Sequence, residues 1–187
     1  AEGEYGFGLY NYGPFFGCKN LKTVILEDGM KTIPSMLFAK CYGLQQIEIP
    51  ESVTSIGGTA FKECTSLEAI SIPDSVTSIG SHCFESCTTL KEVKLSKNLT
   101  TLGSAAFGDC DELQTISIPK TLVKAEGEYG FGLYNYGPFF GCKNLKTVIL
   151  ENGIKTIPAL LFAKCYGLEN IGIPESVTTI GDSAFLE

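Results

Sequence analysis

The 187-residue sequence contains no tryptophan and no arginine, and it has a single histidine, His82. All 14 basic residues are lysines, and the 21 acidic residues bring the net charge to −7. Nucleic-acid recognition depends on a basic face and on arginine forks, and anionic membrane surfaces attract basic segments. The composition therefore argues against a nucleic-acid partner and against binding to an anionic membrane surface.

Long apolar runs are also missing. No stretch approaches the roughly 20 apolar residues of a membrane-spanning helix, so we expect no direct membrane insertion. The first residues lack the basic and then apolar pattern of a signal peptide, an absence that a mature or excised segment would share. The hydrophobic fraction of 44% and the charged fraction of 19% are typical of a folded chain.

Seven of the eight cysteines recur at regular intervals: Cys18, Cys41, Cys64, Cys87, Cys110, Cys142 and Cys165. Five of the six intervals are 23 residues long, and the other is 32. This regularity indicates an internal repeat rather than a disulfide framework. Neighbouring copies would have parallel Cβ vectors, which is poor disulfide geometry, so we expect a buried row of free thiols.

The repeating unit is clearest in residues 44–66, LQQIEIPESVTSIGGTAFKECTS. Ile47 and Ile49 alternate with polar residues, which predicts a short, half-buried strand. Pro50 ends this strand because proline cannot donate to a ladder, and Gly57 permits a sharp bend or a close backbone approach. The remaining apolar positions of the unit are Val53, Ile56, Ala60, Phe61 and Cys64.

One 23-residue unit cannot bury its apolar edge alone, whereas stacked copies build a continuous core. We therefore predict a repeat solenoid, a leucine-rich-repeat right-handed superhelix with one short parallel strand per 23-residue turn and little helix. The return segment is left open as extended, 3₁₀ or a short helix. Units are expected at residues 21–43, 44–66, 67–89, 90–112, 113–144, 145–167 and 168–187, with strands at 21–26, 44–49, 67–72, 90–95, 113–118, 145–150 and 168–173. A buried stack is expected of Phe61, Phe84, Phe107 and Phe162.

A longer period is superimposed on the short one. Residues 1–26 are identical to residues 125–150, and 51 of 61 positions match between residues 1–61 and 125–185. The 32-residue unit carries nine extra residues within a sequence, AEGEYGFGLYNYGPFFG, that occurs at residues 1–17 and again at 125–141. We call these two segments the aromatic insertions. Because the chain begins inside one insertion and ends within a unit, we interpret it as one solenoid segment excised from a longer array.

The run IPESVTSIGGTAFKECTSL, residues 49–67, resembles the BspA-like leucine-rich repeat, also called the Treponema pallidum type. The resemblance covers almost the whole chain in register. It breaks at the aromatic insertions and weakens where Pro34 and Pro158 replace the glycine. It implies a surface or secreted protein of mucosa-associated bacteria or protozoan parasites, with roles in adhesion, co-aggregation and immune recognition and with no catalytic residues.

The function expected is a non-catalytic cell-surface or secreted module that binds a protein or another surface macromolecule. A structural spacer and a targeting appendage of a larger surface enzyme remain alternatives. One histidine cannot supply a convincing nucleophile–histidine–acid set, and no Walker-type phosphate loop occurs. His82, Cys83 and Cys87 hint at a metal, but both cysteines are already explained as core, and zinc requires four convergent ligands. We therefore expect no enzyme activity, cofactor or metal.

Aromatic side chains in the insertions are the candidate ligand-binding residues: Tyr5, Phe7, Tyr10, Tyr12, Tyr129, Phe131, Tyr134 and Tyr136. Tyrosine and phenylalanine interleaved with glycine give a large contact area on an adaptable backbone, and exposed aromatic clusters mark interfaces. The competing interpretation is that the rings fold back onto the flank of the solenoid. The outward strand positions lack aromatics, which predicts a solvated sheet face; they are Ile25, Glu48, Ser71, Lys94, Ser117, Ile149 and Gly172.

Overall fold

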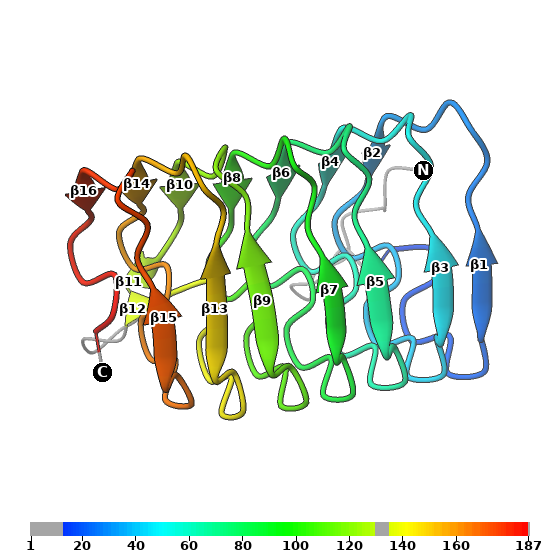
Figure 1. The fold of residues 1–187 in the computed structure, drawn as a ribbon. Coiled ribbons are helices and arrows are strands. Elements are labelled where there is room, and N and C mark those ends of the chain that lie inside the picture. The colour runs from blue at the N-terminus through cyan, green and yellow to red at the C-terminus, as the bar shows by residue number, and fades with distance from the viewer. Residues whose placement is uncertain (1–12, 130–134, 187) are drawn as a thin grey trace.

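The chain winds into a parallel β-solenoid (Figure 1). The computed structural model describes residues 13–129 and 135–186. None of these residues is helical, as the prediction of little helix requires. The described part of the chain accordingly holds no helix with the length and hydrophobicity needed to cross a membrane. The return segment, which the sequence left open, is extended where it forms a second row of strands.

One strand of each turn belongs to a front sheet of parallel strands. Its members are β1 (Thr23–Ile25), β3 (Gln46–Glu48), β5 (Ala69–Ser71), β7 (Glu92–Lys94), β9 (Thr115–Ile118), β13 (Thr147–Leu150) and β15 (Asn170–Gly172). The strands pair within three groups, β1 with β3, β5 with β7, and β9 with β13 and β15. Every one of these pairings is parallel, as predicted, in a register that sets Thr23 opposite Gln46 and Thr147 opposite Asn170. The predicted strands are two to three residues too long. The leucine that opens a unit closes a turn instead, since the N–H of Leu44 donates to the carbonyl of Cys41 at 3.0 Å.

A second sheet of two-residue strands runs along the return side of the solenoid, at the top of Figure 1. Its five-stranded part contains β2 (Thr32–Ile33), β4 (Ser55–Ile56), β6 (Ser78–Ile79), β8 (Thr101–Leu102) and β10 (Lys124–Ala125), and its two-stranded part contains β14 (Thr156–Ile157) and β16 (Thr179–Ile180). Glycine follows several of these strands because successive turns touch there. A Cβ on Gly57 would lie 2.5 Å from the backbone nitrogen of Ser35, and a Cβ on Gly80 would lie 2.5 Å from that of Gly58.

A third hydrogen-bonded ladder links the turns on the flank that carries the phenylalanines, which we call the Phe flank. The N–H of Phe38 donates to the carbonyl of Ala60 at 2.8 Å, and the N–H of Phe61 donates to that of Cys83 at the same distance. Left-handed residues flank these donors, as at Met36 with a φ of 62° and Lys40 with a φ of 60°. Such a conformation is costly outside glycine. The ladder holds it, because Met36 and Lys40 also donate to the next turn.

The phenylalanine row is the central feature of the core. Its fully buried members are Phe38, Phe61, Phe84, Phe107, Phe139 and Phe162, which confirms the predicted stack. Neighbouring rings lie 5.1–5.7 Å apart between centroids, within the range of favourable aromatic pairs. Phe15 stacks on Phe38 at 5.5 Å but remains 45% exposed.

The cysteine row lies beside the phenylalanine row and consists of free thiols, as predicted. The Sγ of Cys87 donates to the carbonyl of Phe61 at 3.2 Å, and that of Cys110 donates to the carbonyl of Phe84 at 3.3 Å. Burial raises the pKa of both thiols well above its ordinary value. Burial likewise raises the pKa of Cys165, to about 12. Cys87 and Cys110 therefore act as neutral donors that link one turn to the previous one.

The second aromatic insertion interrupts only one of the three ladders. The front sheet continues across it, because β9 pairs with β13, and the Phe flank continues because the N–H of Phe107 donates to the carbonyl of Pro138 at 2.8 Å. In the second sheet, no Cα of β10 lies within 8 Å of a Cα of β14. At the second insertion, the hydrogen bonds between turns therefore continue in the front sheet and on the Phe flank, and they are interrupted in the second sheet.

A proline accompanies this break in the second sheet. In an uninterrupted turn the N–H of Gly80 donates to the carbonyl of Ile56 at 2.8 Å. The residue that would donate in the same way to Ala125 is Pro158, which has no N–H to give. The proline that replaces glycine and the nine inserted residues therefore occur together at the point where the second sheet is interrupted.

Candidate functional site

The candidate residues of the first insertion lie outside the described part of the chain, as do Phe131 and Tyr134 of the second. Those of the first insertion are Tyr5, Phe7, Tyr10 and Tyr12. In the second insertion, β11 (Glu128–Tyr129) pairs antiparallel with β12 (Asn135–Tyr136), so the described ends of the insertion form a hairpin. The backbone of Tyr129 lies in this hairpin, and the side chain of Tyr136 is the one candidate ring that the structure places.

Tyr136 packs at the base of the hairpin. Its ring meets that of Phe140 edge to face, with centroids 4.4 Å apart and planes inclined by 85°. Its carbonyl accepts a hydrogen bond from the Oγ of Ser104, one turn earlier, at 2.7 Å. The half-buried Tyr136 therefore joins the base of the hairpin to the preceding turn through its backbone carbonyl, while its ring packs on a residue of the same insertion. This contact does not decide the role of the other tyrosines.

Two glycines let the hairpin base lie close to the next turn. A Cβ on Gly127 would collide with the Leu160 side chain, and a Cβ on Gly137 would collide with the Leu160 carbonyl. Leu160 is itself buried, with a φ of 62°. At Gly137 the neighbour is backbone, so this contact requires glycine, whereas at Gly127 the neighbour is the end of a flexible side chain that can move. The close contact at Gly137 fixes the base of the hairpin against the next turn.

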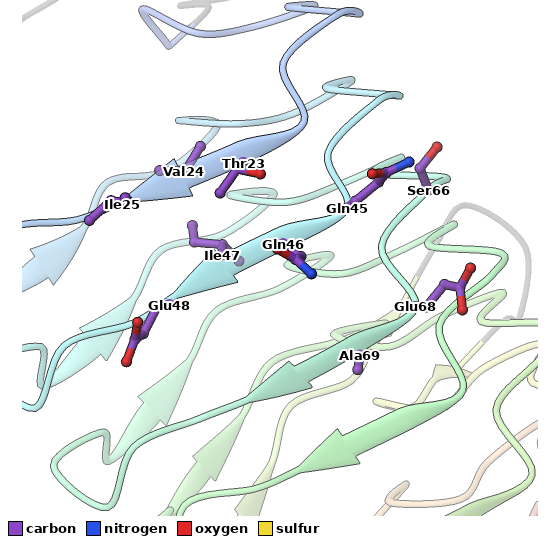
Figure 2. A pocket seen from close by; sticks show the side chains of 10 residues that line it. All are labelled: Thr23, Val24, Ile25, Gln45, Gln46, Ile47, Glu48, Ser66, Glu68 and Ala69. Atoms are coloured by element: carbon purple, nitrogen blue, oxygen red, sulfur yellow. The ribbon is translucent and has the colours of Figure 1, made fainter.

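The outward face of the front sheet forms a shallow groove at its N-terminal end (Figure 2). Its lining includes Thr23, Ile25, Gln46, Glu48, Glu68 and Ala69. These side chains are mixed in polarity and include no aromatic ring. Ile25 is 83% exposed and Ile149, at the same position of the later long repeat, is 52% exposed. Two isolated isoleucines do not form the desolvated anchor that typifies a binding hot spot.

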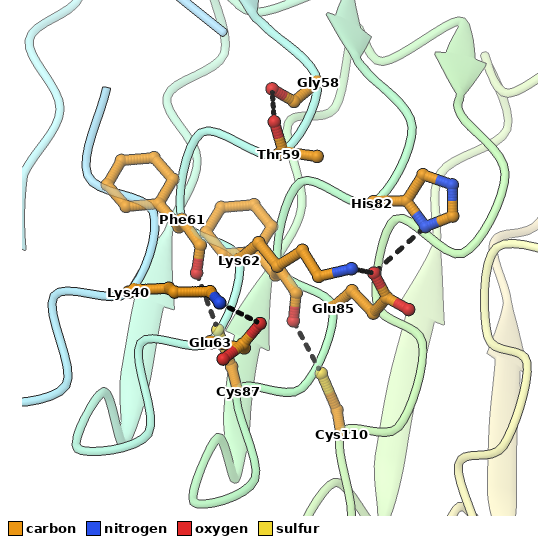
Figure 3. Close-up of polar contacts among 11 residues, drawn as sticks. Lys40, Gly58, Thr59, Phe61, Lys62, Glu63, His82, Glu85, Cys87 and Cys110 are labelled. Carbon is orange, nitrogen blue, oxygen red and sulfur yellow. Dashed lines mark hydrogen bonds and ion pairs between the residues drawn. The ribbon is translucent and has the colours of Figure 1, made fainter. Parts of the chain in front are cut away.

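Charged side chains form pairs along the Phe flank (Figure 3). Glu85 accepts a bond from Lys62 and lies 3.1 Å from the Nδ1 of His82. Burial alone would raise the pKa of Glu85, but the bonds from His82 and Lys62 outweigh it and leave the pKa below its ordinary value. One turn earlier, Lys40 lies 3.7 Å from Glu63. These contacts tie neighbouring turns together.

The same contacts bear on the possible metal site at His82, Cys83 and Cys87. The imidazole of His82 is occupied with Glu85, while both cysteines are fully buried in the core. Among the residues that the structure describes, no group of three potential ligands is arranged to hold a metal ion. The cysteines therefore have the core roles that their template positions indicated.

A parallel β-solenoid with one front strand in each turn of about 23 residues is the architecture of leucine-rich-repeat proteins. The family of BspA type leucine-rich repeat regions matches residues 11–132 and 134–187 in six copies. The chain belongs to this family. A comparison with curated proteins found no match.

Solved structures share the fold. A Treponema pallidum leucine-rich-repeat protein, TpLRR, is 27% identical over 87% of this chain and 74% of its own, with a TM-score of 0.70. The pneumococcal vaccine antigen PcpA is 17% identical over 97% of this chain and 62% of its own, with a TM-score of 0.52. A leucine-rich cell surface protein of Faecalibacterium prausnitzii is 21% identical over 90% of this chain and 62% of its own, with a TM-score of 0.43.

Sequence reasoning missed the residues that anchor the hairpin. Phe140 directly follows the core ring Phe139, and its pairing with Tyr136 spans only four positions. Leu160 resembles any other apolar residue in the repeat, and Ser104 occupies an ordinary turn position. One available signal was the spacing of Gly127 and Gly137 around the extra residues, since paired glycines mark close backbone approaches.

Proposed function

We propose that the chain is a non-catalytic binding module of a cell-surface or secreted protein, and that it contacts a protein or another surface macromolecule through its aromatic insertions. The observation that carries this proposal is that Phe139 already fills the core position of the long turn between Phe107 and Phe162. The additional aromatics of the insertion are therefore not needed to complete the phenylalanine row, which leaves them available for another role.

The contrast with the front sheet supports the insertions as the binding site. Tyrosine offers a large, stiff contact surface at low conformational cost, and it is enriched at interfaces. The exposed front-sheet positions have no such side chain. The family resemblance, which implies adhesive surface proteins, agrees with an external location. A spacer would need no added aromatic hairpin, and a targeting appendage would act through the same binding surface.

Duplication of the insertion suits a bivalent contact. The two copies are five turns apart in sequence, which at about 4.8 Å per turn is roughly 25 Å. A partner that presents repeated or extended sites would engage the second copy at a high effective concentration once the first was bound. Bivalence raises the overall affinity without new contacts, provided that both sites can be reached together.

The test separates the described anchor from the proposed contact residues. The double variant Tyr129→Ser/Tyr134→Ser and the single variant Tyr136→Ser would be compared with the unmodified chain in thermal unfolding and in adhesion to a panel of immobilised extracellular-matrix proteins. Because the first copy is unaltered, we expect the double variant to weaken adhesion at an unchanged Tm, and Tyr136→Ser to lower the Tm. Unchanged adhesion combined with a large fall in Tm for the double variant would assign these rings to packing and would refute the proposal.

A further inference from the structure

The turn between β13 and β14 contains a dipeptide that the binding role does not use. Asn152 and Gly153 are both exposed there, and Gly153 has a φ of 95°. The sequence has seven asparagines, and Asn152 is the one that precedes a glycine. Glycine has no side chain to shield its own backbone nitrogen or to restrict its rotation. Residue 153 therefore has no side chain that would block the approach of the neighbouring carboxamide to its amide nitrogen.

Other asparagines of the solenoid are held in place. The Nδ2 of Asn98 donates to the carbonyl of Asp74 at 2.9 Å, and the Nδ2 of Asn144 donates to that of Asp111 at 2.8 Å. Each of these two asparagines precedes a fully buried leucine, at residue 99 and residue 145. Within the described residues, the carboxamide of Asn152 makes no hydrogen bond of this kind. Asn152 therefore differs from Asn98 and Asn144 both in its carboxamide, which lacks such a bond, and in the residue that follows it, a glycine in place of a buried leucine.

We infer that Asn152–Gly153 is a site of spontaneous deamidation. The backbone nitrogen of Gly153 attacks the Cγ of Asn152, a new N–C bond forms, and the carboxamide nitrogen leaves as ammonia after taking up the proton that the backbone nitrogen loses. The resulting succinimide is opened by one water molecule, which adds its oxygen to either carbonyl carbon. The products are aspartate and isoaspartate at residue 152. Nothing is oxidised or reduced, and the net charge changes by one unit from −7 to −8.

The earlier long repeat indicates that the fold accepts the product. Residue 28, at the position that corresponds to Asn152, is already an aspartate in an Asp-Gly turn. The following glycines are held alike, since the N–H of Gly29 donates to the Oγ of Ser52 at 3.0 Å and that of Gly153 donates to the Oγ of Ser176 at 3.1 Å. Conversion to aspartate would thus make the later turn chemically identical to the earlier one at this position.

The hydrogen bond from Gly153 to Ser176 sets the rate of this reaction. The nitrogen must turn toward the Asn152 side chain and lose its proton before it can attack. The bond to the Oγ of Ser176 directs its N–H toward the next turn instead. The folded chain therefore slows a reaction that the unfolded segment would undergo more quickly, and local opening of this turn releases it.

The test follows deamidation residue by residue in the full chain. The protein is incubated at mildly alkaline pH in water enriched in heavy oxygen, digested with trypsin and analysed by mass spectrometry, alongside the synthetic peptide TVILENGIK that spans residues 147–155. Asn98 and Asn144 are the internal controls, and an Asn152→Asp variant supplies the aspartate standard. We expect label at residue 152 before either control, in two chromatographic products, with the synthetic peptide reacting faster than the folded chain.

Substitution Ser176→Ala tests the restraint. It removes the hydrogen-bond acceptor and leaves the Asn-Gly pair intact, so we expect faster labelling of residue 152 with no change at Asn98. Labelling of residue 152 no faster than at Asn98 and Asn144 would overturn the assignment of the site. An unchanged or slower rate in Ser176→Ala, with residue 152 still labelled first in the unmodified chain, would overturn the role given to Ser176 alone.

Discussion

The rings of Phe61 and Phe84 stack with their centroids 5.1 Å apart and their planes inclined by only 3°. They come from equivalent positions of neighbouring turns, so the geometry of the repeat is expressed directly in the geometry of this pair. Each ring is fully buried and has a further phenylalanine on its other side. Each internal ring therefore packs against the turn before it and the turn after it, so its removal affects two interfaces between turns.

Substitution Phe84→Ala is expected to lower the free energy of unfolding by roughly 3–5 kcal/mol, the usual range for deletion of a buried phenyl ring. Phe15→Ala is the matched control, because Phe15 stacks on Phe38 alone among the described residues and is 45% exposed. Urea denaturation of both variants measures the difference. Equal losses at the two positions would show that burial within the row does not determine the contribution of each ring.

The buried thiols predict a loss of stability at alkaline pH. The pKa of Cys87 is raised by burial, so the native chain keeps this proton at pH values where the unfolded chain releases it. The contribution is fully present below the unfolded value of about 8.5 and falls as the pH rises above it, by about 1.4 kcal/mol per pH unit and per thiol.

Variant Cys87→Ala isolates the contribution of one thiol to this slope. Its unfolding free energy, measured by urea denaturation across the alkaline range, is expected to decline less steeply with pH than that of the unmodified chain. All other ionisable groups are common to both proteins, so the difference between the two slopes reports Cys87. Identical slopes would mean that Cys87 ionises as readily in the folded chain as in the unfolded one.

Glycines at the contacts between turns are expected to resist substitution. Gly80→Ala places a Cβ 2.5 Å from the backbone nitrogen of Gly58, so the turns must separate, at a cost of roughly 1–3 kcal/mol for overpacking. Gly172→Ala is the control, because a Cβ there meets no atom within 4 Å. Thermal unfolding should show a lower Tm for the first variant and little change for the second. A similar Tm for both would argue against the close approach of the turns.

Much of the fold follows from short-range patterns in the sequence. The alternation of Ile47 and Ile49 with polar residues predicted the front strand, and the fixed spacing of Phe84 and Cys87 from their counterparts predicted the two core rows. These predictions succeed because stacked identical turns place equivalent residues next to each other. The ends of the strands were less accurate, since Leu44 uses its N–H to close a turn rather than to extend the ladder.

Other features depend on contacts that no local pattern reveals. The strands of the second sheet are only two residues long, so a segment such as Ser78–Ile79 has no periodicity to recognise. The left-handed conformations of Met36 and Lys40 are imposed by bonds to the next turn, because neither residue favours them intrinsically. At the candidate site, the aromatic residues were proposed from the sequence and stay a prediction. The contacts of Tyr136 with Phe140 and Ser104 are visible only in the folded chain.

The central claim is that the solenoid turn folds without the aromatic hairpin, and that the hairpin is an addition that serves binding. In the unit of residues 113–144, the nine additional residues are 127–135. Their removal restores a 23-residue unit and retains Phe139, the β9–β13 pairing of the front sheet and the ladder of the Phe flank. Residues 3–11 correspond to them in the first insertion, and both deletions would be combined to exclude compensation by either copy.

The most direct measurement is adhesion of this doubly deleted chain to immobilised extracellular-matrix proteins, with its cooperative unfolding by urea measured on the same preparation. We predict cooperative unfolding at a stability close to that of the unmodified chain, together with loss of adhesion. If the folded chain still adheres without either hairpin, the account is contradicted, and the binding site must lie on the solenoid itself.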